Sequence, residues 1–341
     1  MQKCFFLLNL MQRLEILKTG NLVLVDALNH IKWQSFNFPT DVMLWGQRLN
    51  VATRLTSFPT NSTSHYSLQI EYNKIALYLN SGKANYSYWE FKPSKGRNIT
   101  FIELSSRGLE LFNNENKKIA QIPSNAFQPL RFLALGNRSG NLGLYYYSPS
   151  KKRFEAAFQA LNATCDLPSA CEPYGICTYS NTCSCIHAGS GCAGGALAGG
   201  FCAGGNVDVD MLELEDVSSV LRSGPERANV SKEECVKLCL DDCQCASASF
   251  SGGSAGSKAC SLYGLVGGLK QVDRGSGISY MVKVPKGSHG TNGRSNVKKW
   301  VLILVGLVDG LVILVVLGGL GYYFMRKRRR SLLLQEGNPD N

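Results

Sequence analysis

The sequence has little of what an enzyme active site needs. It contains four histidines in 341 residues, scattered among stretches typical of turns and linkers: His30, His65, His187 and His289. Histidine is the usual base beside a serine or cysteine nucleophile, yet no nucleophile accompanies one at a recognisable spacing. We therefore expect that the chain is not an enzyme and needs no cofactor.

Charged residues are almost absent from one long stretch. Residues 301–324 read VLILVGLVDGLVILVVLGGLGYYF and carry one charge, on Asp309. A helix of this length spans roughly 30 Å of hydrocarbon. The sequence therefore predicts a transmembrane helix at 301–325, between a polar stalk at 285–300 and a short cytosolic tail at 326–341.

Cysteines and sequons indicate which side of the membrane the large segment occupies, because basic residues flank the helix equally, five on each side. Twelve of the 13 cysteines lie between Cys165 and Cys260, as expected for disulfides formed in an oxidising compartment. Six N-x-[ST] sequons precede the helix: Asn61, Asn85, Asn98, Asn137, Asn162 and Asn229. We expect a single-pass plasma-membrane glycoprotein with an extracellular N-terminal part, whose net charge of +11 requires no nucleic acid.

Two local patterns resemble other kinds of site. Cys183-x-Cys185 and Cys243-x-Cys245 have a spacing found in zinc sites, but zinc thiolate clusters need a reducing compartment. The stretch 189–194 matches G-x-G-x-x-G, but no strand pattern precedes it and no helical pattern follows. We expect no metal site, and we interpret 189–205 as a flexible linker.

The first half of the chain has a β pattern. From residue 14 to about 160, apolar residues alternate in short runs such as NLVLVD, YSLQIEY and ITFIEL, between clusters of Gly, Asn, Ser and Pro. LKTGNLVLV at 17–25 and NRSGNLGLY at 137–145 repeat a Gly-Asn turn before a strand. The repeat favours one hairpin corner used twice, or two related β domains.

The segment after Cys165 mixes cysteine-paced loops with one short helix. Ser231-Lys-Glu-Glu234 is a capping box, with a hydroxyl at the N-cap and a carboxylate three residues later. It predicts a helix over KEECVKLCLDD, with Cys235 and Cys239 on one face.

The stretch WQSFNFPTD resembles the W-Q-S-F-x-x-P-T-D signature of plant G-type (bulb-type) lectin receptors. The matching residues are Trp33, Gln34, Ser35, Phe36, Pro39, Thr40 and Asp41. RFLALGNRSGNLGLYYY through CDLPSACEPYGIC resembles the S-locus glycoprotein region and its EGF-like knot, and CVKLCLDDCQCAS followed by Cys260 resembles a PAN/apple module. The kinase-less group with these parts is usually called PAN domain-containing proteins.

The resemblance implies a mostly β ectodomain, with disulfide-rich EGF-like and PAN/apple (α+β) modules and one transmembrane helix. The implied domains are a partial bulb-type lectin β-prism at 1–58, a second lectin-like or S-locus glycoprotein-like β domain at 59–160, the EGF-like region with the glycine-rich linker at 161–205, and the PAN/apple domain at 206–284. Trp33 and Phe36 are expected as core anchors, with Pro39-Thr40-Asp41 as the following turn.

The resemblance also implies a disulfide pairing. EGF-like pairing gives Cys165–Cys177, Cys171–Cys183 and Cys185–Cys192, and the PAN module gives Cys235–Cys260 and Cys239–Cys245, which leaves Cys202–Cys243. An exchange of Cys192 and Cys202 is an open alternative. Cys4 is left over, in a segment expected to be processed.

The chain departs from the family at its sugar site, which reads Q-x-D-x-N-x-V-x-Y. The two copies here read Leu17, Thr19, Asn21, Val23, Val25 and Asn137, Ser139, Asn141, Gly143, Tyr145. Leucine in place of an amide removes two hydrogen-bond partners for sugar hydroxyls, so Asn21 and Asn141 are expected to be turn residues. Part of a lectin domain is expected to be missing upstream, and 11 residues after Arg330 cannot hold a kinase.

The predicted membrane helix carries a pattern for association. Gly306-Leu-Val-Asp-Gly310 is a GxxxG motif, which lets two helix backbones approach closely, and it includes Asp309. A carboxylate near the bilayer centre costs about 2.5–3.5 kcal/mol on insertion scales. We hypothesise lateral association through Gly306, Asp309 and Gly310; the alternative is that Asp309 is protonated, or hydrated through a local bilayer defect.

We therefore expect a non-enzymatic cell-surface receptor-like glycoprotein. It would recognise an extracellular protein or glycan, and act as a co-receptor or decoy through a partner receptor kinase or as a homodimer. Two alternatives stay open: a membrane-anchored carbohydrate-binding lectin, and a truncated product of a receptor-kinase-like gene.

Overall fold

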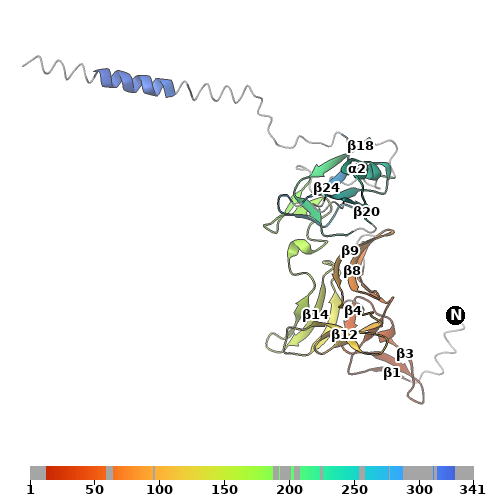
Figure 1. Cartoon of the computed structure of the whole chain (residues 1–341). Helices are drawn as coiled ribbons and strands as arrows, with labels where there is room; N and C mark the ends of the chain where they lie inside the picture. The colour runs from red at the N-terminus through yellow and green to blue at the C-terminus, as the bar shows by residue number, and fades with distance from the viewer. Residues whose placement is uncertain are drawn as a thin grey trace, which may run out of the picture. The chain divides into compact units, whose positions relative to one another are not determined.

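The computed structural model divides the chain into two compact units, 1–288 and 289–341 (Figure 1). It describes residues 13–58, 64–94, 97–186, 192, 201–202, 208–222, 226–252, 258–275, 277–286, 310 and 313–326. In the second unit, residues 313–326 are helical. Among the described residues, no helix is both long enough and apolar enough to cross a membrane. Much of the expected span at 301–325, with Gly306 and Asp309, lies outside the described residues.

The first described element is a three-stranded antiparallel sheet. Its strands are β1 (Arg13–Ile16), β2 (Leu22–Val25) and β3 (Ile31–Gln34), in that spatial order. Val23 and Val25 are buried, whereas Leu14 and Ile16 are exposed, so the sheet packs through one of its faces. A short 3₁₀ helix, η1 (Ser35–Asn37), follows and carries part of the signature stretch.

Three four-stranded antiparallel sheets follow, and they share a common plan. Each combines a three-strand meander with one short edge strand taken from residues 42–56. The edge strands are β4 (Val42–Leu44), β5 (Arg48–Asn50) and β6 (Arg54–Thr56). The meanders are β13 (Leu130–Leu135), β14 (Leu142–Ser148) and β15 (Arg153–Gln159) beside β4; β10 (Phe101–Ser105), β11 (Gly108–Phe112) and β12 (Lys118–Pro123) beside β5; and β7 (Ser64–Ile70), β8 (Ile75–Ser81) and β9 (Ala84–Phe91) beside β6.

The three sheets enclose one apolar core. Each edge strand buries its middle residue almost completely: Met43, Leu49 and Leu55. These three side chains belong to a single cluster with apolar residues from all three meanders. Full burial of such a side chain contributes about 1.5–3 kcal/mol, so three-residue strands are held mainly by their central residue. Strands on both sides of the expected boundary near residue 58 therefore share sheets.

The cysteine-rich part adds two further sheets and a helix. One sheet has the order β17-β16-β23-β19, from β17 (Cys183–Cys185), β16 (Gly175–Cys177), β23 (Leu269–Gln271) and β19 (Val217–Ser219). The other has the order β18-β24-β21-β22-β20, from β18 (Val209–Leu214), β24 (Ile278–Pro285), β21 (Ser247–Gly252), β22 (Lys258–Tyr263) and β20 (Arg227–Ala228). In the first of these sheets β16 pairs in parallel with β23, so the segments 161–205 and 206–284 share a sheet. A second 3₁₀ helix, η2 (Thr164–Asp166), precedes β16.

The capping box predicted from the sequence is confirmed at the start of α2 (Lys232–Asp241). Glu234 N donates to Ser231 Oγ at 3.1 Å, and Ser231 N donates to Glu234 Oε2 at 2.8 Å. Cys235 and Cys239 are fully buried on the inner face of the helix. Two backbone N–H groups that would otherwise lack partners at the helix start are thereby satisfied.

Strand β9 joins the three-sheet core to residues 206–284, the segment that resembles a PAN/apple module, called the PAN part below. The ring of Tyr86 stacks on Tyr263 with centroids 5.9 Å apart, and its hydroxyl accepts a hydrogen bond from Gly264 N at 2.8 Å. Ser87 and Arg222 exchange two backbone hydrogen bonds of 3.2 and 2.7 Å. Buried residues from both sides belong to one apolar cluster, so the two parts pack as one unit.

Candidate functional site

Six disulfides cross-link the cysteine-rich part. The bonded pairs are Cys165–Cys177, Cys171–Cys183, Cys185–Cys192, Cys202–Cys243, Cys235–Cys260 and Cys239–Cys245. These are the pairs that the family resemblance implies, and Cys192 rather than Cys202 is the partner of Cys185. Two of the bonds tie α2 to β22 and to the loop before β21. Within the part of the chain that the structure describes, no cluster of three or more His, Cys, Asp or Glu residues has the arrangement of a metal site.

The aromatic residues of the signature stretch are not core anchors. Trp33 is half-buried and stacks on Phe38, with ring centroids 5.7 Å apart, and Phe38 is itself exposed. Phe36 is also half-buried. Trp33 is paired across the sheet with Leu24, which in turn is paired with the exposed Leu14, so it lies on the open face of the first sheet. This corrects the expectation that both aromatic residues anchor a core.

The Pro39-Thr40-Asp41 segment connects the first sheet to the three-sheet core. Thr40 O accepts a hydrogen bond from Thr56 N at 2.8 Å, and Asp41 O accepts one from Leu135 N at 2.9 Å. These two contacts fasten the segment to two different sheets. The role of Thr40 and Asp41 in these contacts is structural, through the backbone.

Asn21 is engaged by the signature stretch. It is only 4% exposed, and its Nδ2 donates to Gln34 Oε1 at 2.7 Å. Its Oδ1 accepts hydrogen bonds from Ser35 Oγ and Phe36 N, both at 3.2 Å. Both the nitrogen and the oxygen of the Asn21 amide therefore have hydrogen-bond partners within the protein. Asn21 acts as a structural residue and not as a sugar ligand.

Asn141 has the same role in the second copy of the repeat. Its Nδ2 donates to Leu161 O at 2.8 Å, and its Oδ1 accepts from Leu161 N at 3.0 Å. In both copies a hydroxyl two residues earlier accepts from the asparagine N–H, and the glycine between them has a positive φ. The Gly-Asn repeat is thus the same turn present twice. In each copy the asparagine side chain bonds the backbone or side chains just after the third strand of the meander, β3 or β15.

Tyr145 and its neighbours form an aromatic surface that sequence reasoning missed. A Cβ added to Gly143 would come within 2.6 Å of the Tyr145 ring, so this ring covers the glycine. Tyr145 stacks on Phe132 at 4.9 Å, and Phe154 meets both Phe132 and Tyr147 edge to face. We call Phe132, Tyr145, Tyr147 and Phe154 the aromatic ladder. The alternation in LGLYYYS could have predicted this surface, because the leucines point toward the core and Tyr145 and Tyr147 point outward.

The sequon asparagines are accessible wherever the structure describes them. Asn85, Asn98, Asn137, Asn162 and Asn229 are all exposed, and Asn61 lies outside the described residues. Asn137 Oδ1 accepts a hydrogen bond from Phe58 N at 3.2 Å. This bond does not involve the side-chain nitrogen, to which an N-glycan is attached. Each described sequon therefore meets the steric requirement for glycosylation.

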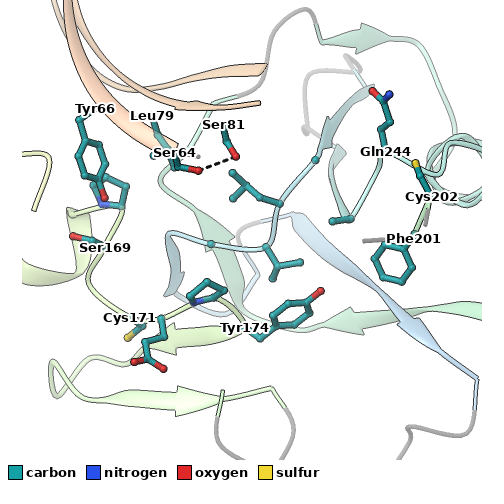
Figure 2. Close-up of a pocket in the computed structure, with 18 of the residues that line it drawn as sticks. Ser64, Tyr66, Leu79, Ser81, Ser169, Cys171, Tyr174, Phe201, Cys202 and Gln244 are labelled. Carbon is teal, nitrogen blue, oxygen red and sulfur yellow. Dashed lines mark hydrogen bonds between the residues drawn. The ribbon is translucent and has the colours of Figure 1, made fainter. Parts of the chain in front are cut away.

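A cavity of about 650 Å³ opens where the β7–β8 hairpin, the loop before β16 and the PAN part meet (Figure 2). The hairpin contributes Ser64, Tyr66, Leu79 and Ser81, and Ser64 Oγ donates to Ser81 Oγ at 3.0 Å. Figure 2 shows Tyr174 among the lining side chains, together with Phe201 and Gln244.

Tyr174 is the unusual residue of this cavity. It is 6% exposed, and its hydroxyl makes no hydrogen bond to any residue that the structure describes. Burial raises the pKa of Tyr174, and burial also raises the pKa of Tyr66 on the opposite wall. A buried hydroxyl without a partner costs about 1–3 kcal/mol, so the position is unfavourable unless something completes it.

Comparison with known proteins finds a PAN domain and distant relatives of the chain. The PAN domain family matches residues 214–283. A G-type lectin S-receptor-like serine/threonine-protein kinase of Arabidopsis thaliana is 23% identical over 94% of this chain and 41% of its own length. A PAN domain-containing protein of Arabidopsis thaliana is 26% identical over 71% of this chain and 52% of its own length.

An S-locus-specific glycoprotein of Brassica oleracea is 26% identical over 68% of this chain and 59% of its own length. The chain thus spans between about two fifths and three fifths of the length of these curated relatives. Its disulfide-rich described part is homologous to cell-surface receptor ectodomains. The chain contains a PAN domain and is distantly homologous to plant G-type lectin receptor kinases, S-locus glycoproteins and a kinase-less PAN domain-containing protein.

Proposed function

We propose that the chain is a non-enzymatic cell-surface receptor-like glycoprotein that recognises an extracellular ligand or partner and acts as a co-receptor or decoy through a partner kinase. The observation that carries the proposal is the packing of the three-sheet core and the disulfide-bonded PAN part into one unit. Such a unit presents strands, loops and module junctions as a fixed recognition surface, with little ordering entropy to lose on binding.

Two further features support an extracellular, membrane-attached location. Twelve cysteines are paired in disulfides, which persist in oxidising compartments. Residues 301–325 form an apolar stretch of the length that a transmembrane helix needs. We place the described β sheets and the PAN part outside the cell and residues 326–341 in the cytosol.

Capture of partners from intact plasma membranes tests the proposal. The tagged full-length chain is crosslinked at the cell surface, purified and analysed by mass spectrometry, beside an unrelated single-pass glycoprotein of equal abundance. We expect enrichment of at least one receptor kinase with the wild-type chain only. Equal recovery of kinases with both baits would contradict the co-receptor proposal.

Lateral association of the membrane segment is a separate part of the proposal. The two glycines of the motif, Gly306 and Gly310, allow two helix backbones to approach closely. The carboxyl group of Asp309 would be stabilised by a hydrogen-bond partner within the hydrocarbon. We expect a Gly306→Leu, Asp309→Leu double variant to lose oligomers seen by crosslinking in membranes. The same oligomers in both chains would exclude association through this motif.

The aromatic ladder favours a second candidate, carbohydrate binding. Tyr147 is 41% exposed and Phe154 52% exposed, and their rings offer flat apolar surfaces on the outside of a sheet. A lectin of this kind would bind a glycan array, and Phe154→Ala would abolish the signal. The co-receptor proposal instead predicts no array binding and no competition by mannose, because Asn21 and Asn141 are bonded within the protein.

A further inference from the structure

We propose that the cavity around Tyr174 is a binding site for a small, uncharged, mostly apolar molecule with a hydrogen-bond acceptor oxygen, such as a carbonyl or an ether. The inference deepens the proposed recognition function by naming where a ligand binds and of what kind it is. Its volume, about 650 Å³, falls within the range of small-molecule sites.

The shape of the site comes from three parts of the fold. Leu79 and Tyr66 line it from the β7–β8 hairpin, Tyr174 from the loop before β16, and Leu265 and Val266 from the loop after β22. The disulfides Cys171–Cys183 and Cys202–Cys243 hold two of these walls, because Cys171, Cys202 and Cys243 all line the cavity. Figure 2 shows these walls facing a common space. The site is therefore preformed.

The hydrogen-bonding groups select the ligand's polar atom. Tyr174 is buried and lines the cavity, and its hydroxyl has no hydrogen-bond partner among the described residues, so we assign it as the donor to a ligand. Ser64 and Ser81, on the hairpin wall, are bonded to each other. A ligand oxygen that accepts from Tyr174 removes the penalty of an unpaired buried donor.

The charge of the lining selects against ions. Among the described residues that line the cavity, Glu172 alone carries a charge, and it is exposed. The accessible surface of the wall is mostly apolar, and Leu79, Phe201 and Val266 contribute to it. Among the described lining residues an anion would meet a carboxylate and no cation, and a cation would meet one exposed carboxylate, so a neutral ligand fits best.

Photolabelling of the full-length chain in its membranes tests the inference. Two aryl trifluoromethyl diazirines serve as probes, one with a para-acetyl group and one with a para-ethyl group of similar size. Attachment sites are read by peptide mapping, so partition of a probe into lipid does not affect the readout. We expect the acetyl probe to label the segments 168–174 and 264–267 about tenfold more than the ethyl probe.

Three variants decide the outcome. Tyr174→Phe removes the donor and should equalise labelling by the two probes; Leu79→Trp fills the cavity and should abolish both signals; Tyr179→Phe, an exposed tyrosine in the same region, should behave as wild type. Absence of labelling in the wild type, persistent labelling in Leu79→Trp, or a persistent acetyl preference in Tyr174→Phe would overturn the proposal.

Thermal unfolding gives a second readout for the conservative variant. Because the Tyr174 hydroxyl has no described partner, Tyr174→Phe should leave the melting temperature unchanged or raise it. A clear loss of stability would show that the hydroxyl already has a partner, and would contradict the proposal. No partner kinase takes part in either experiment, so failure here is distinct from failure of the co-receptor proposal.

Discussion

At the scale of single residues, Asn21 and Asn141 act as clamps in two places. Each amide pairs with the chain that follows the third strand of its sheet: Asn21 with Gln34, Ser35 and Phe36, and Asn141 with Leu161. The clamp explains why the Gly-Asn corner recurs without the other residues of a sugar site. Glycine supplies the positive φ, and asparagine supplies both a donor and an acceptor.

Replacing Asn21 should loosen the signature stretch. Asn21→Ala removes the acceptor for Phe36 N and Ser35 Oγ and the donor to Gln34, at a cost of about 1–3 kcal/mol in the free energy of local opening. Hydrogen exchange measured by mass spectrometry on peptides covering 30–44 should become faster by about one to two orders of magnitude.

The exposed Asn73 provides the matched control for this experiment. Asn73→Ala should leave exchange in 30–44 unchanged. Equal exchange of wild type and Asn21→Ala would mean that the clamp contributes nothing to the local structure.

The clamp also shows a limit of sequence reasoning. A turn at each Gly-Asn pair was predictable, because glycine and asparagine favour left-handed and turn conformations. The hydrogen-bond partners of the two asparagines were not predictable. They lie 13 to 20 positions away in the sequence, and the intervening strands must pair before they come close. The placement of Trp33 was missed for a related reason: aromatic composition does not reveal which face of a sheet remains open.

At the scale of elements, the strands were predictable but their pairing was not. Alternating runs such as YSLQIEY and ITFIEL correspond to β7 and β10. The three edge strands between 42 and 56 have three residues each, which is too short for a periodic signal. Their pairing is set by burial of Met43, Leu49 and Leu55 in a cluster completed by strands as far along the chain as β24.

The capping box of α2 offers an element-scale prediction. Ser231→Ala removes the side-chain acceptor for Glu234 N, which should cost about 0.5–2 kcal/mol and fray the first turn. The two disulfides from α2 should keep the helix in place, so overall folding should persist. Hydrogen exchange at residues 232–235 should rise, and Ser231→Thr should restore protection. Equal protection in Ser231→Ala and wild type would show that the disulfides alone hold the first turn.

At the scale of the whole molecule, the main structural result is the joined core of the β sheets and the PAN part. Tyr86, Tyr263 and the Ser87–Arg222 bridge connect segments more than 130 positions apart. The family resemblance anticipated the PAN domain and the disulfide pairs, because cysteine spacing is a strong local pattern. It did not reveal the cavity, which arises only where three segments distant in sequence meet.

The proposed extracellular placement predicts N-glycosylation. Glycopeptide mass spectrometry of the chain purified from cell membranes should find N-glycans on most of the exposed sequon residues Asn85, Asn98, Asn137, Asn162 and Asn229. Asn116, which is exposed but outside any sequon, should carry none. A complete lack of glycans on all five would contradict the extracellular placement of this segment.

Kinase capture by two deletion variants tests the central claim most directly, namely that recognition resides in the extracellular part. Surface crosslinking and mass spectrometry are applied to the full chain, to a chain lacking 13–286 and to one lacking 326–341, each present at the plasma membrane in equal amount. The account predicts that capture of a receptor kinase survives loss of the tail and disappears with loss of 13–286. Capture that survives without 13–286, or that depends on the tail alone, would contradict it.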